Sequence, residues 1–150
     1  SLVVTRTYSK TWSMAALRLG YLVGPAWVVA ELEKVVLPYH LDALSQAAGT
    51  MALDYQDDME QRVSLLTEER GRLDAALREL PLEVWPSAAN FILFRPTAAD
   101  ADEVWQQLVD RSVLVRNCSG WPGLQGCLRV TIGTTDQDDR FLTALREVLS

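Results

Sequence analysis

Apolar and polar positions follow two different periods along this 150-residue chain, and together they predict a mixture of strands and helices. Short apolar runs bounded by turn residues predict buried strands at residues 2–6 and 21–23, with a polar loop between them. Pro25 suits a first helical position, and an apolar stripe at helical spacing then continues until Pro38. Asp42 is a plausible N-cap for a further helix over residues 43–55.

One long amphipathic helix of about six turns is predicted from residue 57 to Pro81. Its apolar positions recur at steps of three, four and seven residues: Met59, Val63, Leu66, Leu73, Leu77 and Leu80. Such a stripe also suits a dimerising coiled coil, although about three heptads are at the lower limit for that assignment. The pattern alone therefore leaves a packed helix and a coiled coil both open.

The rest of the chain alternates between strands and helices. Strands are predicted at residues 82–85, 90–94, 113–116 and 127–132, and a helix at residues 100–110. The last helix begins with Thr135-Asp136-Gln137-Asp138, which is like a capping box with Asp in the place of Glu. Helices on one face of a small sheet form an α+β layer, and this is the arrangement that we expect here.

Composition changes this picture mainly by exclusion. Charged residues make up 23% of the chain and the formal net charge is −6, so the basic surface of a nucleic-acid binder is not expected. No apolar stretch approaches the length of a membrane span and no signal-peptide pattern is present, so we expect a soluble cytoplasmic protein. Cys118 and Cys127 are expected to be free thiols, and two cysteines with one histidine do not make a metal site.

The candidate chemistry begins in the loop between the first two strands, in the run TYSK at residues 7–10. The amine of Lys10 can form a Schiff base with an aldehyde. Thr7, Ser9 and the guanidinium of Arg18 can hold a phosphate dianion beside it. A solvated surface lysine is the alternative. It is disfavoured because the apolar flanks of Arg18 predict a buried guanidinium, which requires an anion.

Two further arginines are candidates for substrate contacts. Arg116 ends a predicted strand just before a loop rich in glycine and proline. Arg129 lies on an alternating strand and shares one face with Thr131, opposite the apolar residues of that strand. An arginine on the polar face of a strand is often merely exposed, but its planar guanidinium also suits a bidentate clamp on a carboxylate.

These motifs together resemble the fold-type I aminotransferases that use pyridoxal phosphate (PLP). The TYSK run with Arg18 is similar to the cofactor-lysine segment of that group. The runs VLVR at residues 113–116 and GCLRVTIGT at residues 126–134 resemble the C-terminal region of the histidinol-phosphate aminotransferases. The runs at residues 37–41 and 89–94 are similar to further stretches of the same family, so the resemblance covers almost the whole chain.

The resemblance implies an α/β fold class, in which the end of the large PLP-binding domain (residues 1–56) is followed by a small α+β C-terminal domain (residues 57–150). In the family, the long helix at this position leads from the large domain into the small one. The resemblance also implies a homodimer with PLP as cofactor. Its site residues would be Lys10 as the catalytic and PLP-linked lysine, Thr7, Ser9 and Arg18 around the cofactor, Arg129 at the substrate α-carboxylate and Arg116 at a substrate phosphate.

The implied activity is exchange of an amino group between an amino donor, histidinol phosphate, and a 2-oxo acid acceptor, 2-oxoglutarate, in histidine biosynthesis. Three alternatives stay open: an aromatic amino-acid aminotransferase, a PLP-dependent decarboxylase of the same family, and a non-catalytic C-terminal domain that packs or dimerises. No candidate is found for the acidic partner of the pyridine nitrogen or for the aromatic that stacks on the ring. The chain is therefore expected to be the C-terminal half of an enzyme and inactive alone.

Overall fold

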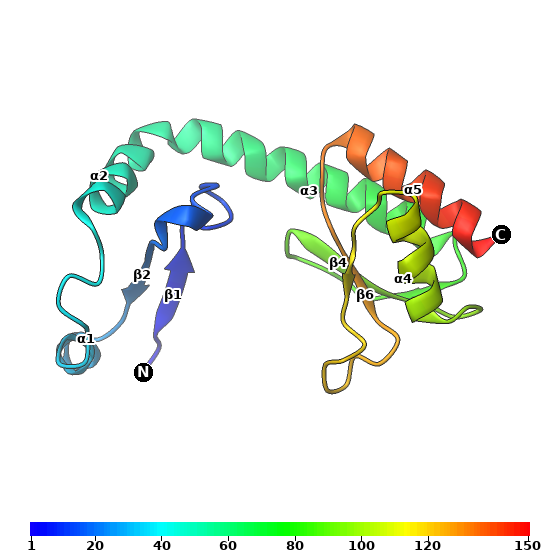
Figure 1. The fold of residues 1–150 in the computed structure, drawn as a ribbon. Helices are drawn as coiled ribbons and strands as arrows, with labels where there is room; N and C mark the ends of the chain where they lie inside the picture. Colours follow the sequence, from blue (N-terminus) through cyan, green and yellow to red (C-terminus); the bar gives the residue numbers. More distant parts are fainter. The chain divides into compact units, whose positions relative to one another are not determined.

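The computed structural model describes all 150 residues, which form two compact units, Ser1–Val63 and Ser64–Ser150 (Figure 1). The division falls inside the longest helix, α3 (Gln56–Arg78), which is the long helix expected from the apolar stripe. None of the helices is both long enough and apolar enough to cross a bilayer.

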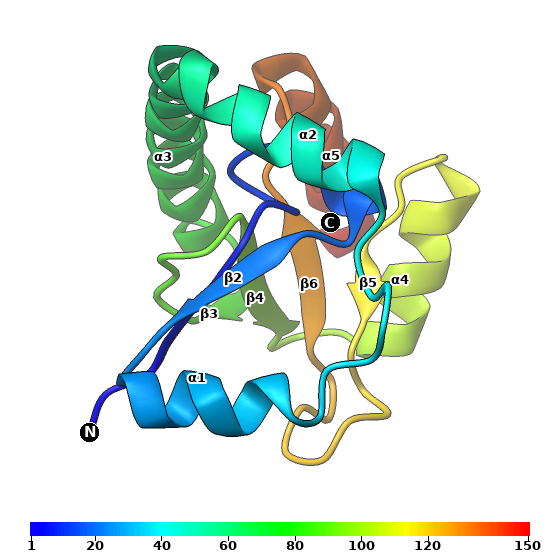
Figure 2. The ribbon, with the colours of Figure 1, turned by 90° about the vertical axis from the view of Figure 1, so that its left-hand side faces the viewer.

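The first unit is built on a two-stranded antiparallel ribbon. Strands β1 (Val4–Thr7) and β2 (Gly20–Val23) pair from Val4 opposite Val23 to Thr7 opposite Gly20. Helix α1 (Ala26–Glu33) lies near the open end of the ribbon, and α2 (Ala43–Ala52) lies near the end that carries the connecting loop (Figure 2). A short 3-10 helix, η2 (Leu53–Tyr55), then leads into α3.

Within these 150 residues the first two strands are not buried, contrary to the prediction. Every residue of β1 and three of the four residues of β2 are exposed. An apolar run is buried only when other layers cover it, and a two-stranded ribbon provides no such layer by itself. Helix α1 also ends earlier than predicted, at Glu33, and Pro25 is its extended N-cap rather than its first helical residue.

The cap predicted for α2 is confirmed. The carboxylate of Asp42 accepts hydrogen bonds from the backbone N–H of Ser45 at 2.9 Å and from the Ser45 hydroxyl at 2.6 Å. Both bonds favour the ionised carboxylate, so they lower the pKa of Asp42. The helix therefore begins at the residue that the sequence indicated.

The second unit is a four-stranded antiparallel sheet with helices on one face. The strand order is β3 (Leu82–Val84), β4 (Phe91–Pro96), β6 (Leu128–Thr131) and β5 (Arg116–Asn117). The C-terminal half of α3 packs on the sheet together with α4 (Ala101–Asp110) and α5 (Thr135–Leu149). The helices and most strands thus lie where the periodicity predicts them.

The core of this unit follows from strict alternation along β4 and β6. Ile92 and Phe94 of β4 and Leu128 and Val130 of β6 turn toward the helices, while the residues between them turn away. The helices contribute Leu73, Leu77, Val104, Leu108, Phe141, Leu142 and Leu145 to the same cluster. Full burial of each large apolar side chain stabilises the fold by about 1.5–3 kcal/mol.

The strand predicted at residues 113–116 is largely wrong. Only Arg116 and Asn117 pair with β6. Val115 is buried, and its carbonyl oxygen accepts a hydrogen bond from Trp105 Nε1 of α4 at 3.0 Å. The backbone before Arg116 is therefore held by a helix instead of by a neighbouring strand, although the side-chain pattern is that of a strand.

The capping box of α5 lies one residue earlier than predicted. Thr134 is the N-cap, and its hydroxyl oxygen accepts from the backbone N–H of Gln137 at 3.4 Å. The side-chain oxygen of Gln137 in turn accepts from the backbone N–H of Thr134 at 3.0 Å. Because a glutamine fills the third position as the motif requires, Asp138 is released for another contact.

Asp138 is buried at the start of α5, with 2% of its surface exposed. Its Oδ1 accepts from the backbone N–H of Gly133 at 3.0 Å, whereas its Oδ2 is buried without a hydrogen-bond partner. Burial raises the pKa of Asp138 to about 6, and the nearby charge of Glu69 adds to the shift. Glu69 itself is held ionised, because hydrogen bonds from Arg72 lower its pKa.

We expect Asp138→Asn to stabilise the full-length protein by about 1–3 kcal/mol at pH 7.5, because the amide keeps the bond to Gly133 and carries no charge that must be buried. The raised pKa of Asp138 favours folding most below its unfolded pKa near 3.8, and this contribution is lost as the pH rises through about 6. The variant should therefore depend less on pH between 4 and 7, as measured by urea unfolding.

The matched control is Asp139→Asn, which changes an exposed carboxylate that pairs with Arg72 at 2.7 Å. It should lower the free energy of unfolding slightly or leave it unchanged. An Asp138→Asn protein that is no more stable than the wild type at pH 7.5 would contradict the assignment of a costly buried carboxylate.

Candidate functional site

Lys10 lies in a tight loop at the end of the β1–β2 ribbon. The backbone N–H of Tyr8 donates to the carbonyl of Leu19 at 3.0 Å, which extends the strand pairing one residue beyond β1. The chain then reverses through bonds from Ser13 N to the Lys10 carbonyl at 3.0 Å and from Met14 N to the Tyr8 carbonyl at 3.1 Å. The Lys10 side chain is exposed and forms no hydrogen bond or ion pair within the chain.

The predicted phosphate-binding residues lie in the same unit. Thr7 Oγ1 accepts from the backbone N–H of Ser9 at 3.0 Å, so these two hydroxyl residues adjoin Lys10. Arg18 follows the 3-10 helix η1 (Ala15–Leu17) in the left-handed conformation, with φ of 51°. Its Nη1 donates to the carbonyl of Ala15 at 2.7 Å. A bulky residue at positive φ costs about 1–2 kcal/mol, and such strain clusters at functional sites.

Within these 150 residues the side chain of Arg18 is exposed, contrary to the prediction that it is buried. The apolar residues beside it behave differently, since Leu17 and Leu19 are both partly buried. Exposed as it is, Arg18 forms no ion pair with a carboxylate of the chain, so its guanidinium is open to an anion.

Aromatic packing and two close backbone approaches fix this loop. Tyr8 stacks on Trp12 with ring centroids 5.6 Å apart and meets the edge of Tyr21, which agrees with a packing role for Tyr8. A Cβ added at Gly20 would lie 2.7 Å from the carbonyl oxygen of Arg6, and one at Gly49 would lie within 3 Å of Leu19 Cδ2. The two residues that follow Arg18, Leu19 and Gly20, therefore lie in close contacts that require glycine at positions 49 and 20.

Arg116 and Arg129, in the second unit, are directly opposite each other on β5 and β6. Opposite residues of an antiparallel pair point to the same face, and here it is the face away from the helices. Like charges in this arrangement destabilise a sheet. Neither arginine pairs with a carboxylate of the chain, and Arg129 Nε is buried without a hydrogen-bond partner. An anion shared by the two guanidinium groups would remove both costs.

Each of these arginines also lies over an aromatic ring. The guanidinium carbon of Arg129 lies 4.7 Å from the ring centroid of Phe91, and that of Arg116 lies 5.8 Å from the ring of Trp121. Such contacts orient a guanidinium and leave its N–H groups free to donate. Sequence reasoning missed both rings, although the alternation along β4 already predicts that Phe91 and the buried Ile92 point to different faces of the sheet.

A third arginine, Arg95 of β4, occupies the same face of the sheet and was also missed. Its guanidinium lies 5.1 Å from the ring of Trp85, and its Nη1 lies 3.5 Å from Glu83 Oε2 on β3. Arg95 therefore has a carboxylate partner within the chain. Its position could have been predicted from the alternation, but its ion pair depends on the pairing of β3 with β4, which no local pattern reveals.

The cysteines are free and both are buried. Cys118 N donates to the carbonyl of Cys127 at 2.9 Å and so extends the β5–β6 pairing by one residue. No group of three or more histidine, cysteine, aspartate or glutamate side chains is gathered as metal ligands would be.

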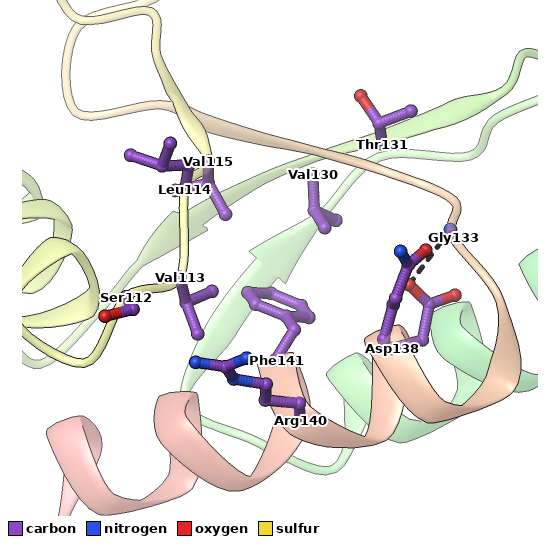
Figure 3. Close-up of a pocket in the computed structure, with 11 residues that line it drawn as sticks. Ser112, Val113, Leu114, Val115, Val130, Thr131, Gly133, Asp138, Arg140 and Phe141 are labelled. Atoms are coloured by element: carbon purple, nitrogen blue, oxygen red, sulfur yellow. Dashed lines mark hydrogen bonds between the residues drawn. The ribbon is translucent and has the colours of Figure 1, made fainter.

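A cavity of about 290 Å³ lies at the edge of the sheet in the second unit (Figure 3). It is bounded by residues 112–115, the end of β6 and the first turns of α5, where residues 112–115 do not pair with β6 and β5 has not yet begun. Phe141 and Val130 form its apolar wall. None of the predicted site residues lines it, so it does not belong to the candidate site.

The six predicted site residues therefore form two sets. Thr7, Ser9, Lys10 and Arg18 all lie on the segment that joins β1 to β2 in the first unit. Arg116 and Arg129 come together on the outer face of the sheet in the second unit. The first set offers an amine and, on the same segment, two hydroxyls and a guanidinium; the second offers two open guanidinium groups.

Comparison with known proteins gives a consistent result. The family model for class I and II aminotransferases matches residues 1–145. The histidinol-phosphate aminotransferase of Streptomyces avermitilis is 48% identical over 147 residues, and the match covers 98% of this chain. It covers only 38% of that relative, so the chain spans well under half of the relative's length.

Solved structures share the fold. The histidinol-phosphate aminotransferase of Clostridium acetobutylicum matches with a TM-score of 0.90 at 22% identity, covering 98% of this chain and 45% of that one. The L-threonine-O-3-phosphate decarboxylase of Porphyromonas gingivalis matches with a TM-score of 0.88 at 24% identity, covering 99% and 46%. The fold is thus common to proteins named for different reactions.

We expect Gly20→Ala to destabilise the full-length protein by about 1–3 kcal/mol, because the new methyl group would press on the backbone carbonyl of Arg6 and separate the two strands. The matched control is Gly71→Ala in the middle of α3, where a Cβ meets nothing within 4 Å. That change should stabilise the protein by about 0.5–1 kcal/mol, as alanine does in a helix. Urea unfolding that finds Gly20→Ala as stable as the wild type, or more stable, would refute the close approach at Gly20.

Proposed function

This chain belongs to the family of class I and II aminotransferases, and from this we propose that the full-length protein is a PLP-dependent aminotransferase. We propose that it transfers the amino group between histidinol phosphate and 2-oxoglutarate in histidine biosynthesis, as a cytoplasmic homodimer. Residues 1–56 would end the large PLP-binding domain of a fold-type I enzyme, and residues 57–150 would form its small C-terminal domain. The 48% identity to a protein named for that reaction supports the assignment.

The observation that carries the proposal is the unpartnered amine of Lys10 on the same β1–β2 segment as Thr7, Ser9 and Arg18. These residues fit PLP chemically: an amine meets its aldehyde, and hydroxyls with a guanidinium meet its phosphate. When bound, the cofactor would supply the electron sink that aminotransfer requires. Lys10 would anchor it in the resting enzyme and, once displaced by substrate, would take the proton from the substrate Cα.

We assign substrate binding to the two opposite arginines. Arg129, half-buried and seated over Phe91, would clamp the α-carboxylate of substrates that carry one. Arg116, exposed and without a carboxylate partner, would meet the phosphate of histidinol phosphate. The lack of any acidic partner for Arg116 favours a phosphorylated donor over the aromatic amino-acid alternative, because a plain aromatic side chain would leave this charge opposite Arg129 uncompensated.

The first test identifies the lysine that anchors PLP. Borohydride reduction of the full-length holoenzyme followed by peptide mapping should place the pyridoxyl group on Lys10. Lys10→Ala should fold normally and lose several orders of magnitude in turnover, because it removes the group that moves the proton.

Lys34 provides the matched control, since it is the only other lysine among these 150 residues and pairs with Glu31 at 2.6 Å. Lys34→Ala should retain wild-type turnover and cofactor content. Label on Lys34 or on a lysine elsewhere in the protein would end the assignment of Lys10.

The second test concerns Arg116. Arg116→Ala should lower kcat/KM for histidinol phosphate by roughly one to three decades, which is the scale of a lost charge-assisted contact. It should leave kcat/KM for phenylalanine or glutamate comparatively unchanged. Steady-state kinetics with the three donors measures both effects in the full-length enzyme.

Arg129→Ala gives the contrasting pattern, because its proposed partner is a carboxylate that amino acids and 2-oxo acids share. It should raise KM for glutamate and for 2-oxoglutarate alike. If Arg116→Ala reduced all donors equally, Arg116 would be structural. If the wild-type enzyme used phosphorylated and plain donors equally well, the aromatic aminotransferase alternative would be preferred.

A further inference from the structure

The guanidinium of Arg116 lies over the indole ring of Trp121 and forms no hydrogen bond or ion pair within the chain. We infer that Trp121 is a positioning residue that holds Arg116 for a phosphate and thereby sets the preference for phosphorylated amino donors. This inference rests on the proposed function, in which Arg116 meets the substrate phosphate. The assignment comes from the packing in the second unit and involves no residue of the Lys10 loop.

The position of Arg116 requires such support. It lies on a two-residue strand at the edge of the sheet, is exposed, and faces Arg129 directly across the ladder. Repulsion between the two guanidinium groups favours rotamers in which Arg116 swings into solvent. A long side chain that is free to do so loses conformational entropy when it binds an anion, and this loss weakens binding.

Trp121 can oppose this motion because its loop is anchored at both ends. Its backbone N–H donates to the Cys118 carbonyl at 2.9 Å, and its carbonyl accepts from Leu124 N at 3.0 Å. The loop begins at Asn117, whose side-chain amide donates to Asp102 at 2.6 Å and whose side-chain oxygen accepts from Ser119 N at 2.9 Å. The ring therefore occupies a defined place beside Arg116 even though 46% of Trp121 is exposed.

A ring is better suited than a carboxylate to hold an arginine that must bind an anion. The aromatic face attracts the flat side of the guanidinium and leaves its N–H edge free to donate to phosphate oxygens. A carboxylate would occupy that edge and neutralise the charge. Arg95 shows the alternative on the same face of the sheet, since it lies over Trp85 and also pairs with Glu83. Arg116 has the ring without the carboxylate.

The experiment compares Trp121→Ala, Trp121→Phe and Trp85→Ala in the full-length holoenzyme. The main readout is the ratio of kcat/KM for histidinol phosphate to kcat/KM for histidinol. Loss of an exposed cation–π contact should lower this ratio roughly two- to five-fold in Trp121→Ala, through KM with kcat unchanged. Trp121→Phe should restore part of the preference. Trp85→Ala removes a matched ring from an arginine that is not assigned to the substrate, and should leave the ratio unchanged.

A second readout separates this inference from the proposed function. The dissociation constant of inorganic phosphate for the holoenzyme, measured by calorimetry, should rise roughly two- to five-fold in Trp121→Ala and stay unchanged in Trp85→Ala. If the wild type does not prefer histidinol phosphate but phosphate binding still depends on Trp121, the proposed donor is wrong and the positioning role stands. Unchanged phosphate binding in Trp121→Ala, or equal losses with histidinol and histidinol phosphate, overturns the positioning role.

Discussion

The register between β5 and β6 places Arg116 directly opposite Arg129, and the chemistry of this face of the sheet depends on that constraint. Two like charges on neighbouring strands cost free energy unless something compensates them. The chain provides rings, Phe91 and Trp121, and these orient the charges without neutralising them. The sheet is stable in spite of this pair because its other face buries an uninterrupted apolar cluster against three helices.

One face of these strands therefore forms the apolar core, and the other face carries the arginines. In β6, Leu128 and Val130 are buried in the core. Because Arg129 lies between them on the same strand, its backbone is held in place. Rigid placement of a guanidinium reduces the entropy that is lost when it binds its partner. The backbone of Arg116 is held less firmly. Its strand has two residues, and Val115 before it bonds to Trp105 of α4 instead of to β6. This difference explains why the exposed arginine needs an additional side chain to hold it.

Periodicity predicted the elements of the second unit well, because each of them has one apolar and one polar face in a single packed layer. It failed where non-local contacts decide. Residues 113–115 have a strand pattern, but Trp105 of α4 binds the carbonyl of Val115 and keeps this stretch out of the sheet. The capping box is different, because Thr134 and Gln137 match the motif in the local sequence and could have been predicted from it. Only the course of residues 113–115 depends on contacts beyond the local sequence.

The candidate site shows the same limit. Local spacing was enough to bring Thr7, Ser9 and Lys10 together, since they lie within four residues of one loop. It was not enough to predict the left-handed backbone at Arg18 or the exposure of its side chain within this chain. The facing of Arg116 and Arg129 depends on the register of two strands separated by a loop. Alternation fixed only which face each side chain takes.

Asp138 and Arg129, two ionisable groups near β6, differ in whether burial can make them neutral. Beyond its C-terminal end, Asp138 lies in the interior beside Glu69, and burial raises its pKa to about 6 so that the neutral form becomes accessible. An arginine has no such option, because its guanidinium stays protonated at any pH that a protein experiences. The half-buried charge of Arg129 can only be compensated by a counter-charge. The chain offers none, so the guanidinium of Arg129 is open to an anion.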